Sequence, residues 1–325
     1  MKAVVCKEFG PPSSLVIEEI QSPVPGEKEV LVQVKACSVN FPDTLIVQGL
    51  YQFKPELPFT PGSDVAGIVK QVGEKVTHLQ PGDEVFGFVM HGGYAEEVVM
   101  PGNACFKKPP MMDFPVAASF MMAYGTSYHA LKDRGKLQEG ETLLVLGASG
   151  GVGLAAVELG KLMGAKVIAA ASSDEKLNLC KEYGADETIN YSKEDLKNRI
   201  KELTNGKGVD VVYDPVGGAY TEPALRGTAW EGRYLVVGFA AGDIPKIPLN
   251  LPLLKGCAVV GVFWGSFAMK TPQKNLENAM ELMQWYGAGK LKPHIHGIYP
   301  LDKAKNALHA MMNREVRGKV VIECS

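Results

Sequence analysis

The chain has 325 residues, of which 46% are hydrophobic, and carries a formal net charge of -2 with both signs dispersed. This length suits about two globular domains, and the charge balance excludes the basic stripe of a nucleic-acid or membrane-surface protein. No apolar run approaches the ~20 residues that a membrane span needs. We therefore expect neither nucleic acid nor membrane as a partner.

The six cysteines are scattered, and none forms a C-x-x-C pair. This spacing argues against a disulfide framework or a cysteine-built zinc site and favours buried free thiols in a reducing compartment. The N-terminal run Met1–Cys6 is typical of a strand rather than a signal peptide. We expect a cytoplasmic protein.

Residues 1 to about 118 are predicted to be β-rich. Gly/Pro turns such as Pro81-Gly82-Asp83 separate short apolar runs, a pattern typical of a small, partly open barrel. The expected strands are Lys2–Cys6, Leu15–Ile20, Val30–Ala36, Ala66–Val72, Glu84–Phe88 and Tyr94–Met100.

From about 119 to 264 the pattern alternates between strand and helix, which predicts a parallel, doubly wound α/β sheet of the Rossmann type. The expected strands are Thr142–Leu146, Lys166–Ala170, Glu187–Ile189, Val209–Tyr213, Arg233–Val237 and Val259–Val262. The expected helices are Gly151–Met163, Glu175–Tyr183, Lys193–Leu203 and Tyr220–Ala229.

The first of these strands runs into glycines at G-x-x-G-x-x-G spacing, Gly147, Gly150 and Gly153. A sharp strand-to-helix turn leaves backbone N–H groups at the helix N-terminus, where they suit a pyrophosphate. Close packing of strand on helix is the alternative explanation of the glycines. The strand–turn–helix context favours a dinucleotide site, with contacts at Ser149, Gly150, Gly151 and Val152.

After residue 264 the pattern changes again, with helices expected at Gln273–Tyr286 and Leu301–Met312 and a final strand at Gly318–Ile322. We expect this tail to rejoin the N-terminal barrel. The predicted domains are thus 1–118 with 265–325 for the substrate and 119–264 for the dinucleotide. The cleft between two domains is the expected place for reaction at a nicotinamide.

Several landmarks together resemble the medium-chain dehydrogenase/reductase superfamily over nearly the whole length. They are Pro61-Gly62-Ser63-Asp64-Val65-Ala66-Gly67, Val72-Gly73, Pro81–Val85, Gly93-Tyr94-Ala95-Glu96 and Gly147–Gly153. Within it the chain looks most like the zinc-independent quinone oxidoreductases, the zeta-crystallin group. The resemblance implies a GroES-like, barrel-like catalytic domain, a Rossmann domain, NADPH as cofactor, and a homodimer or homotetramer.

The departures from the zinc-dependent branch indicate that no zinc is bound. Asn40 stands where those enzymes carry a cysteine ligand, Gly62-Ser63-Asp64 replaces their glycine-histidine-glutamate, and no cysteine lobe follows Val85. A catalytic zinc needs about three N, S or O ligands. Without a Lewis acid, an electron-poor quinone or activated alkene is a better acceptor than a simple ketone.

The choice between NADPH and NADH depends on the end of the second strand. Ser172, Ser173 and Lys176 offer donors, one of them charged, to a 2′-phosphate. The alternative is that Ser173 or Asp174 caps the next helix and Lys176 is solvated, and Asp174 leaves a route to NAD. The resemblance adds a phosphate or adenine contact at Tyr191 and favours NADPH.

Other contacts come from the resemblance alone, position by position. Tyr51 and Thr126 match residues near the nicotinamide, and two strand ends are expected to line the cofactor groove or meet the carboxamide through backbone groups. The residues at these two strand ends are Val237, Gly238 and Phe239, and Val262, Phe263 and Trp264. The alternative is that they only terminate their strands and contact no cofactor.

The expected reaction centre follows a strand in Val39–Asp43, where neither Asn40 nor Asp43 has the character of a core residue. We expect Asn40 to orient the acceptor carbonyl, Asp43 to fix the loop or a water chain, and Tyr51 to donate to the acceptor oxygen. Helix capping is the alternative for Asp43. We identify no general acid, since His91, His129 and His294 have the character of structural or surface residues. Solvent can protonate a reduced quinone. Reduction of the quinone by one-electron steps is an alternative to hydride transfer.

Three functions remain open. The first is an NADPH-dependent quinone or activated-alkene reductase, and the second is an enoyl-thioester or 2-alkenal reductase. The third is a cofactor-binding protein with little catalysis. Aromatic residues that suit an acceptor pocket fit equally well in a core; they are Phe41, Phe53, Tyr124 and Phe267.

Overall fold

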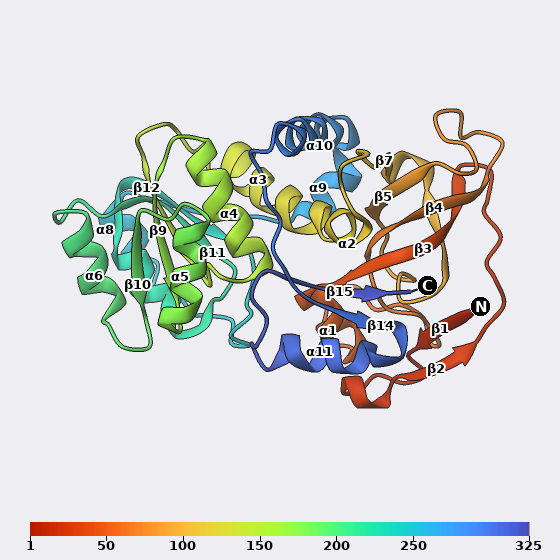
Figure 1. Cartoon of the computed structure of the whole chain (residues 1–325). Coiled ribbons are helices and arrows are strands. Elements are labelled where there is room, and N and C mark those ends of the chain that lie inside the picture. Colours follow the sequence, from red (N-terminus) through yellow and green to blue (C-terminus); the bar gives the residue numbers. More distant parts are fainter. Residues whose placement is uncertain (325) are drawn as a thin grey trace. The chain divides into compact units, whose positions relative to one another are not determined.

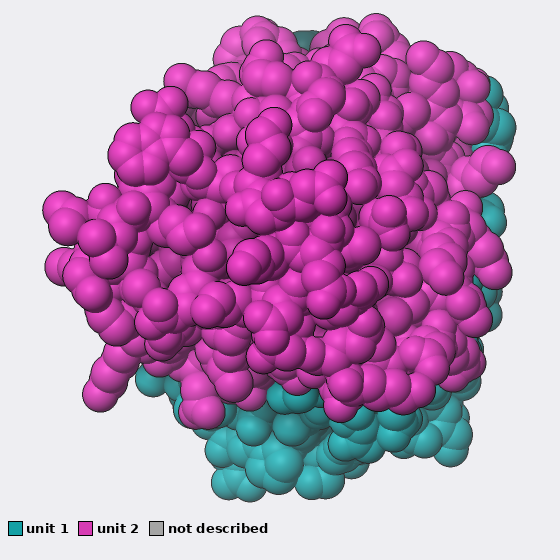
Figure 2. Space-filling view, turned by 90° about the vertical axis from the view of Figure 1, so that its left-hand side faces the viewer, with its two compact units in different colours: residues 1–122, 293–325 teal, residues 123–292 magenta. Residues whose placement is uncertain are grey.

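A computed structural model describes residues 1–324 of the chain. These residues form two compact units, one of residues 1–122 with 293–324 and one of residues 123–292 (Figure 2). The first and the last described residues, Met1 and Cys324, both belong to the first unit (Figure 1).

Unit 1 is built on a mainly antiparallel sheet, in which only β14 and β15 pair in parallel among the described strands. Its central member is the long strand β3, Glu29–Val39. Its strands follow the order β14-β15-β3-β4-β5-β7, with β6 also paired to β3 and a separate β1-β2 ladder. Valines of β3 and their partners form the buried core, as expected for β-branched residues in a sheet. The other strands are β1 Lys2–Val5, β2 Val16–Glu19, β4 Asp64–Val72, β5 Glu84–Phe88, β6 Glu97–Pro101, β7 Cys105–Lys107, β14 Ile295–Pro300 and β15 Lys319–Glu323.

Short helices close unit 1. Helix α11 contacts α1 and strands β14 and β15, and its buried Ala307 and Leu308 extend the core. The helices are η1 Pro12–Ser14, α1 Phe41–Val47, η2 Gly102–Ala104, α2 Phe114–Ala118, η6 Leu301–Lys303 and α11 Ala304–Met312. After α2, η3 Met121–Gly125 begins in this unit and ends in the other.

Unit 2 is built on a parallel sheet in the order β10-β9-β8-β11-β12-β13. This is the doubly wound dinucleotide-binding order, so the predicted α/β fold with a Rossmann sheet and a GroES-like domain is confirmed. In the central strands, Leu143–Leu146 and Val167–Ala171 are apolar and buried, as is typical of parallel strands covered on both faces. The strands of the sheet are β8 Thr142–Leu146, β9 Lys166–Ala171, β10 Glu187–Asn190, β11 Val209–Asp214, β12 Thr228–Val236 and β13 Ala258–Gly261.

Helices run alongside this sheet, α4 against β8 and β9 and α5 against β9 and β10 (Figure 1). The helix expected to reach Ala229 ends at Arg226, because Gly227 follows and Thr228 already belongs to β12. The helices are α3 Thr126–Tyr128, η4 His129–Arg134, α4 Gly151–Leu162, α5 Asp174–Glu182, α6 Leu196–Leu203, η5 Gly218–Tyr220, α7 Thr221–Arg226, α8 Asn250–Lys255, α9 Trp264–Lys270 and α10 Pro272–Gly287.

The compact units have different boundaries from the expected domains, since residues 265–292 fall in unit 2. Helix α10 accounts for the difference. Its Glu281 pairs with Lys132 at 2.6 Å, and its Asn278 donates to Asp133 at 2.9 Å. Only the tail from Pro293 onward lies with the N-terminal strands.

Candidate active site

A buried polar cluster lies where β3 runs into α1 in unit 1. Asn40 is the N-cap of α1, and Asp43 occupies its third position. Asn40 is 5% exposed and Asp43 1% exposed, so both are buried polar residues, although neither belongs to the hydrophobic core cluster of unit 1. Buried polar groups of this kind must be hydrogen-bonded to persist.

Asp43 accepts three hydrogen bonds. The Asn40 backbone N–H donates at 2.8 Å, the Ser63 hydroxyl at 2.9 Å and the Tyr94 hydroxyl at 3.0 Å. Burial raises the pKa of Asp43, and these three donors oppose that rise. The bond to Asn40 is half of a capping box, so Asp43 combines the capping role with anchorage of the loop around Ser63.

Asp64 and Lys319 complete the cluster. Ser38 donates to Asp64 Oδ2 at 3.1 Å, and Lys319 Nζ lies 4.0 Å from the same oxygen. Lys319 also donates to Asn40 Oδ1. Burial raises the pKa of Asp64 to about 7, although Lys319 opposes the rise, and burial lowers the pKa of Lys319.

Sequence reasoning missed Lys319 and the role of Asp64. The expected strand began at Ala66, whereas β4 begins at Asp64, which pairs across the sheet with Ser38. Lys319 opens β15, whose next residue, Val320, pairs with Val39. A lysine directly before the apolar run Val320–Ile322 was the one available signal, since charged residues are almost never fully buried unless paired.

Tyr51 lies in the same unit as Asn40 and Asp43. It is half-buried and packs against the core of unit 1. Burial raises the pKa of its phenol, and the nearby Asp43 carboxylate adds to that rise. The three residues expected at the reaction centre therefore come from one region of unit 1.

The raised pKa of Asp64 has a consequence for stability. An unfolded aspartate has a pKa near 3.9, whereas the pKa of Asp64 in the folded protein is about 7. Between about pH 4 and pH 7 the folded state therefore binds more protons at Asp64 than the unfolded state does. The contribution of Asp64 to stability is thus lost as the pH rises through this range. Relative to Asp64→Asn, the wild type is expected to lose up to about 4 kcal/mol of unfolding free energy over that range. Urea unfolding of both proteins at several pH values measures the difference, and a constant difference would contradict the assignment.

The carboxyl ends of the parallel strands in unit 2 carry the expected cofactor residues. Gly150 is the N-cap of α4, and Gly151 and Val152 begin its first turn, where N–H groups lack intrahelical partners. A Cβ on Gly153 would lie 2.3 Å from the Gly147 oxygen. The turn is therefore closed by backbone packing and fits a diphosphate on α4.

Next to it, the end of β9 presents donors. Lys176 Nζ lies 3.3 Å from the Ser172 hydroxyl, and Ser173 caps α5 by accepting from the Lys176 backbone at 3.3 Å. Asp174, the acid that leaves a route to NAD, is held by Asn190 at 2.5 Å and Lys193 at 2.6 Å. This donor set fits a 2′-phosphate better than a free ribose diol.

The remaining expected contacts follow other strands of the sheet. Tyr191 comes directly after β10, with its ring centroid 4.2 Å from that of Tyr220. Val237 and Gly238 follow β12, and both backbone N–H groups donate to the Asp214 oxygen, at 2.9 and 3.2 Å. Phe239 follows them in the same loop.

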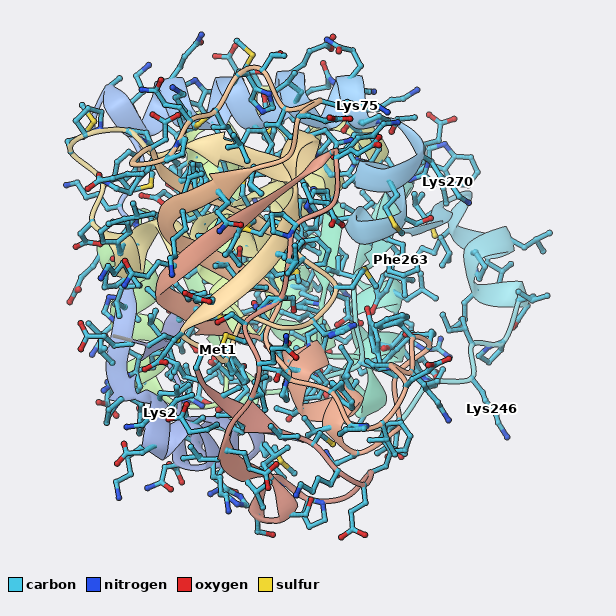
Figure 3. The ribbon with its side chains drawn as sticks, turned by 90° about the vertical axis from the view of Figure 1, so that its right-hand side faces the viewer. Met1, Lys2, Lys75, Lys246, Phe263 and Lys270 are labelled. Carbon is cyan, nitrogen blue, oxygen red and sulfur yellow. The ribbon has the colours of Figure 1, made fainter. Side chains whose placement is uncertain are left out.

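After β13 the chain continues through Val262, Phe263 and Trp264. Val262 N donates to Val236 at 2.9 Å, Phe263 is exposed (Figure 3), and the Trp264 indole donates to Asn275 at 3.0 Å. Thr126 begins α3 and follows Gly125, on which a Cβ would lie 2.9 Å from the Trp264 ring. Their contacts with a cofactor remain predictions.

Two of the aromatic residues considered for an acceptor pocket have other partners in unit 2. Tyr124 is buried and donates to Glu158 at 2.7 Å, and Phe267 stacks on His129 at 3.9 Å. His129 itself is buried beside Asp133 at 2.8 Å. In unit 1, Phe53 stacks on His91 at 6.1 Å, and burial lowers the pKa of that histidine.

Within residues 1–324, no group of three His, Cys, Asp or Glu side chains is arranged to hold a metal ion. None of the helices in the same range is long and apolar enough to cross a bilayer.

Comparison with known proteins places the chain in a family. Residues 26–110 match the alcohol dehydrogenase GroES-like domain, and residues 151–285 match the zinc-binding dehydrogenase domain. A quinone oxidoreductase-like protein 2 homolog of Nematostella vectensis is 43% identical over 99% of this chain and 88% of its own length.

Two solved structures extend the comparison. Escherichia coli quinone oxidoreductase in complex with NADPH has a TM-score of 0.94 at 30% identity, covering 99% of this chain and 100% of that one. The CurK enoyl reductase has a TM-score of 0.91 at 27% identity, covering 100% and 99%. Together with the glycine turn and the strand order, these matches show that the chain belongs to the quinone oxidoreductase family of the medium-chain dehydrogenase/reductase superfamily.

Proposed function

We propose that the chain is an NADPH-dependent, zinc-independent reductase that transfers a hydride to a quinone or another activated alkene. The observation that carries the proposal is the donor set at the end of β9, Ser172, Ser173 and Lys176, beside the glycine turn of α4. The family supports it, because the related Escherichia coli quinone oxidoreductase was solved with NADPH.

When bound, NADPH supplies the hydride of the reduction. The first turn of α4 holds the diphosphate through backbone N–H groups, and Lys176 with the two serines holds the 2′-phosphate. Thr126, Tyr191 and the residues after β12 and β13 line the rest of the cofactor. Asn40 donates an N–H to the acceptor oxygen, where negative charge develops. Tyr51 is a second donor, Asp43 fixes the loop that carries Asn40, and solvent provides the proton.

Zinc independence is proposed from the chemistry of the donors in the unit 1 cluster. Asn40, Ser63 and Asp64 stand where the zinc-dependent enzymes carry a cysteine and the histidine and glutamate of their glycine-histidine-glutamate, and Asp64 is paired with Lys319. A zinc site prefers Cys and His ligands. An ammonium beside Asp64 also occupies the position where a cation would otherwise balance the carboxylate.

A panel of acceptors tests the proposal. NADPH oxidation is followed at 340 nm with 1,4-benzoquinone, a crotonyl thioester and 2-alkenals, with NADH in parallel. We expect NADPH consumption with the quinone or the alkenals. The alternative, an enoyl-thioester reductase, is favoured by the likeness to CurK enoyl reductase and predicts fastest turnover with the thioester. NADPH binding without consumption across the panel would indicate a cofactor-binding protein instead.

We also propose that the chain forms a homodimer, or a homotetramer built from such dimers, through the open edge of the unit 2 sheet. Strand β13 is the last in the sheet, and apolar side chains near it are exposed: Trp230 by 70%, Leu253 by 77% and Leu254 by 69%. An open edge beside an apolar surface favours association.

The six cysteines are all free, which supports a location in a reducing compartment, the cytoplasm.

The oligomer is tested by light scattering coupled to size exclusion. The wild type is expected to elute at two or four times the chain mass, and Leu254→Asp with Val259→Asp at a lower multiple. Leu50→Asp is the matched control, because Leu50 is exposed in unit 1. A wild type that elutes as a monomer at micromolar concentration would contradict the proposal.

A further inference from the structure

The amide of Asn40 lies in a closed ring of buried polar groups. Lys319 donates to Asn40 Oδ1, Asn40 Nδ2 lies 3.3 Å from the Ser38 hydroxyl, and Ser38 donates to Asp64 at 3.1 Å. Lys319 closes the ring at 4.0 Å from Asp64. All four side chains are buried, so the hydrogen bonds they make with one another fix how they lie.

The ring fixes which way the Asn40 amide faces. An ammonium has donors only, so the atom of Asn40 that faces Lys319 must be the carbonyl oxygen. The NH₂ group then faces Ser38, whose own hydrogen goes to Asp64. Among residues 1–324, Ser38 is the one acceptor within hydrogen-bond distance of Nδ2. One of its two N–H bonds is therefore left for an acceptor oxygen.

The ammonium also polarises the amide. A hydrogen bond from a charged donor to Oδ1 draws electron density toward the oxygen and makes the N–H groups better donors. The effect is strong in a buried site because the local dielectric is low. Asp64 balances the charge of Lys319, and the Asp43 carboxylate nearby contributes to the same balance.

We propose that Lys319 is a positioning residue for the reduction, which holds the Asn40 amide with one N–H toward the acceptor oxygen and strengthens that N–H as a donor. This inference rests on the proposed function, because it assigns Asn40 to the acceptor. It places a functional residue about 280 positions from Asn40 in the sequence, on the last strand of unit 1.

A double-mutant cycle tests the inference. Lys319→Met is expected to lower kcat about 10-fold and Asn40→Ala about 100-fold, with the KM for NADPH nearly unchanged. If Lys319 acts through Asn40, adding Lys319→Met to Asn40→Ala lowers kcat by less than about 2-fold further. The inference would be overturned if the fall in kcat of the double variant were the product of the two single falls, or if Lys319→Met were fully active. Lys303→Met is the matched control, because Lys303 is an exposed lysine of unit 1.

Two further variants guard against misfolding. Lys319→Met leaves Asp64 buried without its counter-ion, so the cycle is repeated with Lys319→Met/Asp64→Asn, in which both buried charges are gone. Lys319→Gln keeps a donor without the charge and is expected to recover part of kcat. A Lys319→Gln enzyme no better than Lys319→Met, in a protein that melts normally, would count against the positioning role.

A spectroscopic measurement does not depend on turnover. In ¹⁵N-labelled protein the side-chain amide signal of Asn40 is assigned by its absence in Asn40→Ala. It is expected to shift in Lys319→Met and to stay in place in Lys303→Met; an unmoved signal would overturn the inference. A wild type that reduces nothing in the acceptor panel overturns the proposed function and the inference together, whereas an active wild type with a fully active Lys319→Met overturns the inference alone.

Discussion

Asn40→Ala is expected to lower kcat about 100-fold with quinone or alkenal acceptors, since removal of one donor to a developing oxyanion costs roughly 10²- to 10³-fold. The KM for NADPH is expected to change little, because the cofactor residues lie on other elements. Steady-state kinetics at saturating NADPH give both values. The backbone N–H of Asn40 still bonds Asp43 in this variant, so helix α1 keeps that part of its cap.

Two controls separate catalysis from folding. Asn103→Ala removes the same amide from an exposed position of unit 1 and is expected to have wild-type kcat. Asn40→Ser keeps a small acceptor near Lys319, and its melting temperature shows whether the cluster stays intact. An Asn40→Ala enzyme that melts normally and retains full turnover would remove Asn40 from the mechanism.

The second large effect concerns the cofactor. Lys176→Met is expected to raise the dissociation constant for NADPH by about 10- to 100-fold, because a hydrogen bond to a charged group contributes roughly 1.5–3 kcal/mol and 1.4 kcal/mol is tenfold. Affinity for NADH is expected to stay nearly unchanged, since NADH lacks the 2′-phosphate. Fluorescence titration with each nucleotide measures the two constants.

Lys181→Met is the matched control, because Lys181 is an exposed lysine in the last turn of the same helix, α5. It is expected to bind both nucleotides as the wild type does. Equal losses for NADPH and NADH in Lys176→Met would indicate a general structural effect instead of phosphate recognition. If Lys176→Met bound NADPH as tightly as the wild type, Lys176 would be a solvated surface residue, which its sequence context also allows.

Local sequence signals predicted the fold class because they are dense in this chain. The glycine turn after Leu146 and the alternation of strand and helix determine the parallel sheet within short stretches of sequence. Element ends were less predictable: the helix expected to reach Ala229 stops at Arg226, where strand pairing of Thr228 with Val209 competes with helical propensity.

The candidate site was predictable only in part, since its members meet through strand register. Asn40, Asp43 and Tyr51 lie close in sequence, and a strand followed by a polar loop indicates them. Lys319 reaches Asn40 only because Val320 of β15 pairs with Val39 of β3. No periodicity within either segment specifies that partner, so the ion pair with Asp64 was not predictable from local pattern.

The position of β15 affects how the chain folds during synthesis. This strand lies between β14 and the central β3, although nearly 280 residues separate their sequences. All strands of the parallel sheet, up to Gly261, leave the ribosome before β15 is made. We expect unit 2 to fold during synthesis, while the edge of β3 that later pairs with β15 is still unpaired. Until Lys319–Glu323 leave the ribosome, the N-terminal strands are then the part of the chain that needs chaperones most.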